Sequence, residues 1–77
     1  MTDPLAIRYA NHRTAARRHA SEQNDAMMMV AHKAASHLYM NAPPAPFREI
    51  DAIAKALAAD PHITTTEAAL KAAGLEV

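Results

Sequence analysis

The sequence predicts an all-α protein, with one long N-terminal helix and two short helices packed back on it. Twenty of the 77 residues are alanine and only one is glycine. Alanine is the best helix former and glycine is among the worst. Large apolar residues recur at the three- and four-residue spacing of a helix face. The few threonines, isoleucines and valines never alternate with polar residues, so a β-sheet is excluded.

The length predicts one small helical domain over residues 1–77. A chain this short buries only about 60% of its unfolded surface, so its core is marginal. Cysteine is absent, which excludes disulfides and zinc–thiolate sites. No apolar run reaches the roughly 18 residues that span a bilayer or has the form of a signal peptide. We therefore expect a cytoplasmic protein without a membrane partner.

The first helix is predicted over residues 4–40. Asp3 can cap its start and Pro4 suits its first position. No glycine or proline follows until Pro43, which favours one continuous helix. The alternative is a break within 21–25, because a helix of this length is well above the usual 8–20 residues.

The segment 26–40 is the densest apolar stretch of the chain. At about 100° per residue its core stripe is predicted to contain Met27, Val30, Ala31, Ala34 and Leu38. Leu5 and Tyr9 lie in phase with this stripe if the helix is continuous. Met28, Ala35 and Tyr39 form a second stripe, and Met29 and Met40 lie on the far side. Apolar side chains thus occupy more of the circumference of this helix than one core-facing stripe requires. Another surface must therefore cover the additional apolar side chains.

A proline-rich linker is predicted at 41–46, followed by a second helix at 46–59. Prolines lack a backbone donor and hold the preceding residue out of the helical region. The second helix has one tight apolar stripe. Its members are Phe47, Ile50, Ile53, Ala54 and Leu57.

A short third helix is predicted at 65–73. Thr64 and Glu67 have the spacing of a capping box at its start. Gly74 has the position that adopts positive φ in a Schellman ending. The segment LAADPHITTTEAALKAAGLEV, residues 57–77, resembles the front of a bacterial helix-turn-helix. Such motifs continue into a recognition helix after the glycine turn, but this sequence stops at Val77. If DNA is bound, the arginines of the first helix must therefore bind it.

Enzyme chemistry has no support in the sequence. There is no glycine-rich phosphate loop and no nucleophile elbow. We therefore expect no catalytic activity, small-molecule substrate or cofactor. Met28, Met29, His32 and Met40 do not have a diagnostic metal-ligand spacing, and methionine in helical register is more often core or contact surface. No metal site is predicted.

The charges are unevenly distributed, although they sum to zero. Residues 1–20 have a net charge of +3 and residues 46–77 have a net charge of −2. A charged contact face is predicted from the basic front of the first helix. Its residues are Arg8, His12, Arg13, Arg17, Arg18 and His19. The alternative interpretation is a solvated flank with no partner.

The predicted function is non-catalytic protein binding by an inhibitor, adaptor or regulator. The partner is another protein or a second copy of the chain. The predicted apolar anchors are Met28, Met29, Tyr39 and Met40, because methionine adapts to irregular partner surfaces. The alternative is a small nucleic-acid-binding regulator that uses the basic face. The weight of alanine suggests a bacterial, plasmid or phage genome.

Overall fold

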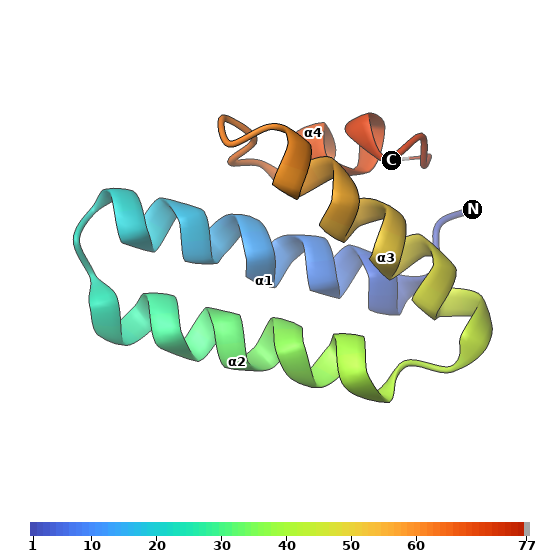
Figure 1. Ribbon diagram of the computed structural model, residues 1–77, viewed down its shortest axis with the longest axis horizontal. Helices are drawn as coiled ribbons and strands as arrows, with labels where there is room; N and C mark the ends of the chain where they lie inside the picture. Colours follow the sequence, from blue (N-terminus) through green and yellow to red (C-terminus); the bar gives the residue numbers. More distant parts are fainter. Residues whose placement is uncertain (77) are drawn as a thin grey trace.

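The computed structural model describes residues 1–76, which form helices joined by short turns (Figure 1). In chain order these are α1 (Pro4–Ser21), α2 (Asp25–Asn41), α3 (Pro44–Ala59) and α4 (Thr66–Ala72). No strand is present in this part of the chain. The predicted all-α class is therefore confirmed.

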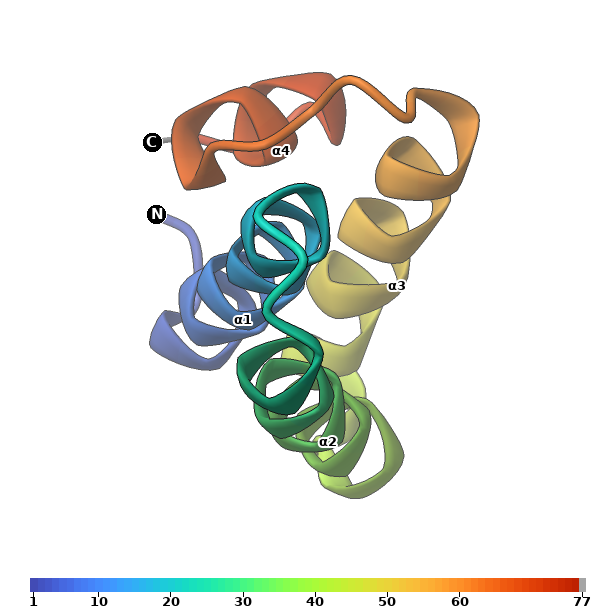
Figure 2. The same cartoon turned by 90° about the vertical axis from the view of Figure 1, so that its left-hand side faces the viewer.

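Helix α1 is the centre of the fold. Figure 2 shows α2 below it, α4 above it and α3 along one flank. All three of these helices pack on α1, whereas α2 and α3 have little contact with each other. Helices α1 and α2 form a hairpin, and α3 crosses α1 obliquely (Figure 1). As a result, α2 is covered mainly on the side that faces α1.

The predicted helix over 4–40 is broken between α1 and α2, as the alternative interpretation expected. Gln23 has a φ of 58°, the left-handed region. Its N–H donates to the Ala20 carbonyl at 3.1 Å, and the Asn24 N–H donates to the His19 carbonyl at 2.8 Å. These two bonds are those of a Schellman ending. The Asn24 side chain then accepts the Met27 N–H at 3.3 Å and caps α2.

The linker is shorter than the predicted 41–46. Helix α2 continues through Asn41 and α3 begins at Pro44, so only Ala42 and Pro43 lie between them. A proline in the first turn of a helix sacrifices no hydrogen bond, because the first N–H groups have no intrahelical partner. Pro44 and Pro46 therefore lie within the first turn of α3 and are not part of the linker.

Helix α4 and its N-cap each begin one residue later than predicted, with the cap at Thr65 and the helix at Thr66. The Thr65 hydroxyl, not that of Thr64, accepts the Ala68 N–H at 3.2 Å. The predicted capping box with Glu67 is therefore wrong. The Thr64 carbonyl instead accepts a hydrogen bond from the Arg18 guanidinium at 2.6 Å.

The predicted end of α4 is confirmed. Gly74 has a φ of 77° and its N–H donates to the Lys71 carbonyl at 3.0 Å. The Leu75 N–H reaches back to the Leu70 carbonyl at 2.9 Å. Both hydrogen bonds of a Schellman motif are thus present.

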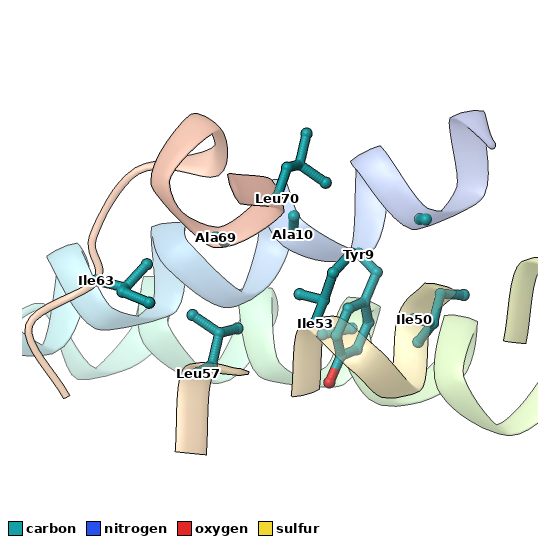
Figure 3. Close-up of a cluster of buried hydrophobic side chains, with 10 residues drawn as sticks. Tyr9, Ala10, Ile50, Ile53, Leu57, Ile63, Ala69 and Leu70 are labelled. Atoms are coloured by element: carbon teal, nitrogen blue, oxygen red, sulfur yellow. The ribbon is translucent and has the colours of Figure 1, made fainter. Parts of the chain in front are cut away.

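The core lies where α3 and α4 meet α1 (Figure 3). Helix α3 supplies Ile50, Ile53 and Leu57, which are fully buried as their stripe predicted. Tyr9 and Leu70 are also buried, at 4% and 2% exposure. Helix α1 contributes mainly alanines, whose small side chains let its neighbours approach closely. The core therefore depends on a few large residues from α3, α4 and their connection.

Two predicted core residues of α2 lie on the surface. Met27 and Val30 are 45% and 60% exposed. Ala31 and Ala35 are the buried residues of this helix. The prediction placed the larger apolar side chains of segment 26–40 on the core stripe. Helix α2 instead turns the side of its small residues toward α1.

Arg17 joins α1 to the end of α3. Its guanidinium donates to the carbonyls of Leu57, Asp60 (2.7 Å) and Ile63 (3.0 Å). The last carbonyls of a helix have no intrahelical partner, and a positive charge is favourable near them. Arg17 therefore caps α3 from a neighbouring helix.

We expect Arg17→Gln to lower the free energy of unfolding by about 1–3 kcal/mol, because part-buried carbonyls lose a charged donor. Arg8→Gln is the matched control, since Arg8 is exposed and should contribute less than about 0.5 kcal/mol. Urea denaturation of both variants measures the difference. Equal stabilities would show that Arg17 does not hold α3 in solution.

Gln23→Gly should raise the free energy of unfolding by about 0.5–1 kcal/mol, because glycine adopts positive φ without steric cost. Gly74→Ala is the converse test. A Cβ at Gly74 would meet no atom within 4 Å, so its cost is conformational only, about 1 kcal/mol. The midpoints of thermal and of urea unfolding should rise for Gln23→Gly and fall for Gly74→Ala. Destabilisation by Gln23→Gly would contradict the left-handed turn.

Candidate protein-binding groove

Exposed apolar side chains are concentrated on α2. Within residues 1–76 the large hydrophobic residues that are exposed include Met1, and all the others lie on α2. Those others are Met27, Met29, Val30 and Met40. Met29 and Met40 are 51% and 81% exposed. They are eleven positions apart, about three helical turns, and therefore share one side of the helix.

A groove lies between α2 and α3, with α1 as its floor. Its volume is about 340 Å³, at the lower end of the range for ligand pockets. The lining residues are Tyr9, Arg13, Ser36, Tyr39, Met40 and Ala54. The groove exists because α3 leaves α2 soon after the two-residue linker and crosses α1 instead (Figure 2).

Aromatic contacts fix one end of the groove. The Tyr39 ring lies 6.2 Å from the Tyr9 ring and 5.0 Å from the Phe47 ring, measured between centroids. The Tyr39–Phe47 pair is edge-to-face, which is a favoured arrangement of aromatic rings. Tyr39 is therefore held by packing from α1 and α3 and is half-buried.

A polar network continues from Tyr39 onto α3. Its hydroxyl donates to Asp51 Oδ1 at 3.0 Å, and Lys55 Nζ lies 3.1 Å from Asp51 Oδ2. The Lys55 and Tyr39 hydrogen bonds lower the pKa of Asp51 below its ordinary value. Conversely, the bond to Asp51 raises the pKa of Tyr39. The only carboxylate in this network is therefore already paired on both oxygens.

Tyr9 and Arg13 form the floor of the groove. Figure 3 shows the Tyr9 ring within the core cluster, with its hydroxyl pointing away from α4. Burial raises the pKa of Tyr9, and the positive charge of Arg13 acts in the opposite direction. Arg13 is half-buried, and its Nη1 lies 3.3 Å from His32 Nδ1 on α2. A guanidinium is thus placed between two helices beside an aromatic ring.

The predicted apolar anchors are partly brought together. Tyr39 and Met40 line the groove, and Met29 lies further along the same side of α2. Met28 is half-buried and lies on the side of α2 that faces α1. Whether the four residues bind a partner remains a prediction, but three of them have the exposure or the position that such a role needs.

The predicted charged face is divided among different sides of α1. Arg8, His12 and His19 share one outer side by helical register. Arg13 points into the groove, Arg17 binds α3, and Arg18 binds the α3–α4 connection. Arg17 and Arg18 lie about 100° apart on the helix, but both reach the α3–α4 connection, Arg17 at Asp60 and Ile63 and Arg18 at Thr64.

Several groove residues were not recognised as site residues in the sequence. Tyr9 was assigned to the core, and Ser36 and Ala54 have no distinguishing pattern. His32 was considered only as a metal ligand. The groove depends on where α3 crosses α1, and no local sequence signal encodes that crossing.

Within the described part of the chain, no three histidine, aspartate or glutamate side chains come close enough to hold a metal ion. None of the helices over residues 1–76 has the length and apolar character required to cross a membrane. Comparison with protein-family models, curated proteins and solved structures found no match to this chain. The site must therefore be interpreted from its own geometry.

Tyr39→Phe should raise the pKa of Asp51 toward its ordinary value of 3.8, while Lys55 keeps it below that value. A lowered carboxyl pKa stabilises the native state above the unfolded pKa, and this contribution is lost as the pH falls through the folded pKa. The destabilisation by Tyr39→Phe should therefore be present at neutral pH and shrink in acid. A ¹³C carboxyl NMR titration measures the shift. An unchanged Asp51 titration would show that the hydroxyl and carboxylate do not interact in solution.

Proposed function

We propose that this protein is a non-catalytic protein-binding module whose contact surface is the α2–α3 groove with Met29 and Met40. Such a module acts as an inhibitor, adaptor or regulator by occupying its partner. The observation that carries the proposal is the exposure of large apolar side chains on a single, one-sidedly covered helix. Large exposed apolar patches on small proteins are typical of interaction sites.

The chemistry of the groove supports a protein partner. Tyrosine, methionine and arginine are enriched at protein interfaces, and all three line this groove. Tyr39 is held by two neighbouring rings, so little side-chain entropy is lost when a partner packs on it. Met40 is flexible and 81% exposed, which lets it adapt to the partner surface.

Nucleic-acid binding by the basic face is less well supported. Phosphate binding needs arginines that are free to reach the backbone. Arg17 and Arg18 instead donate to backbone carbonyls of the protein itself. The side of α1 that has Arg8 has no other arginine of this helix, because Arg13, Arg17 and Arg18 lie on other sides.

The double variant Met29→Gln/Met40→Gln should keep the fold and lose protein binding. Both side chains are at least half exposed, so the helical circular dichroism and the melting temperature should change little. Peptides selected against the unmodified protein from a displayed library of helical sequences should bind the double variant at least about tenfold more weakly, because interface anchors contribute much of the binding free energy. Isothermal titration calorimetry measures the affinities.

Met27→Gln is the matched control, because Met27 is also exposed but lies on another side of α2. Its peptide affinities should equal those of the unmodified protein. If Met27→Gln weakens binding as much as the double variant, or neither does, the α2–α3 groove is not the contact surface. A steep loss of affinity with salt for a DNA duplex would support the nucleic-acid alternative instead.

A further inference from the structure

The Arg13 guanidinium has no carboxylate partner within the described residues 1–76. Within residues 1–76 the ion pairs join Met1 to Glu76, His19 to Glu22 and Lys55 to Asp51. None of them includes Arg13. Its Nε is shielded from solvent and has no hydrogen-bond partner in this part of the chain. The contact of Nη1 with His32 supplies at most one neutral acceptor.

This arrangement favours an external carboxylate. A partly desolvated guanidinium with unused donors is costly, and a carboxylate that accepts from the Nη groups of the half-buried Arg13 offsets that cost, although Nε itself is shielded. Asp51, the carboxylate that is bonded to the groove residue Tyr39, is also bonded to Lys55. The Ser36 hydroxyl lines the same groove and is able to donate a further hydrogen bond.

The remaining walls of the groove are apolar. Met40, Ala54 and the two tyrosines line the groove together with Arg13. A volume of about 340 Å³ suits one or two side chains rather than a whole enclosed ligand. The complementary group is therefore an acidic side chain with an apolar neighbour.

We propose that the groove binds an acidic amphipathic segment of another protein, with its carboxylate on Arg13 and its apolar side chain against Tyr39 and Met40. This inference rests on the proposed function and adds the chemistry of the partner to it. Charge complementarity carries it: the groove presents a cation, and its own chain supplies no counterion within residues 1–76.

The test uses two small probes that differ only in charge. They are 4-phenylbutyrate and the uncharged 4-phenylbutyramide, titrated into ¹⁵N-labelled protein and followed by NMR. The carboxylate should shift the resonances of Arg13, Tyr39 and Met40. The amide should bind at least about tenfold more weakly, because a hydrogen bond from a guanidinium to a carboxylate is roughly twice as strong as one to a neutral acceptor.

Arg13→Gln should reduce the affinity for 4-phenylbutyrate to that for the amide. Arg8→Gln, on the outer side of α1, should leave it unchanged. The comparison of the two probes on the unmodified protein stands even if Arg13→Gln fails to fold. Equal binding of the two probes would overturn carboxylate recognition but leave an apolar protein-binding groove, whose own test is the methionine double variant.

Three other outcomes would also overturn the inference. Inorganic phosphate that binds as tightly as 4-phenylbutyrate would identify a general anion site. The absence of shifts with every probe would show that Arg13 takes no ligand. A dimer in sedimentation that is lost in Arg13→Gln would make a second copy of this chain, not another protein, the occupant.

Discussion

The corner at which α3 turns toward α4 depends on one guanidinium. Arg17 reaches from α1 and binds the carbonyls of Leu57, Asp60 and Ile63. The Leu57 carbonyl would otherwise be an orphan at the end of α3, and the other two carbonyls belong to the connection that follows it. With the corner held, Ile63 reaches the core and α4 lies on the far side of α1 from α2 (Figure 2). The direction of α3, and with it the groove, follows from this cap and from the short linker at the other end of α3.

The abundance of alanine explains both the close packing and the exposed methionines. At the contacts of α1 with α3 and α4, Ala6 and Ala10 are fully buried. Small residues let the helices approach closely, but each buries little apolar area. The large side chains of α3 and α4 therefore contribute most of the stability of the core. Helix α2 meets α1 through Ala31 and Ala35. Its large residues are therefore left for the surface.

The features that were predicted correctly from the sequence are local. Asp3 accepts the Leu5 N–H at 2.9 Å, and Gly74 forms the Schellman turn. The stripe of Ile50, Ile53 and Leu57 is buried as its spacing indicated. In each case the residues that determine the structure lie within a few turns of one another, so helical geometry alone relates them.

The features that were missed depend on contacts between distant residues or on an unusual local conformation. Nothing marks Gln23 as left-handed, because glycine or asparagine is the common residue there. Nothing in α2 itself marks the side of Ala31 and Ala35 as the one that faces α1, and this orientation leaves Met27 and Val30 on the surface. Arg17 caps a helix about 40 positions away in the chain, which no helical period reveals. The groove combines residues of α1, α2 and α3, and only the crossing of α3 brings them together.

The aromatic residues give the groove an optical signal of its own. The chain has no tryptophan and two tyrosines, and both tyrosines line the groove, with their rings 6.2 Å apart. The ultraviolet emission of the unmodified protein therefore comes from this one place. A molecule that packs on Tyr39 or disturbs its bond to Asp51 will change that emission without any attached dye. Occupancy is thus readable by tyrosine fluorescence in dilute solution, with partners that contain neither tryptophan nor tyrosine.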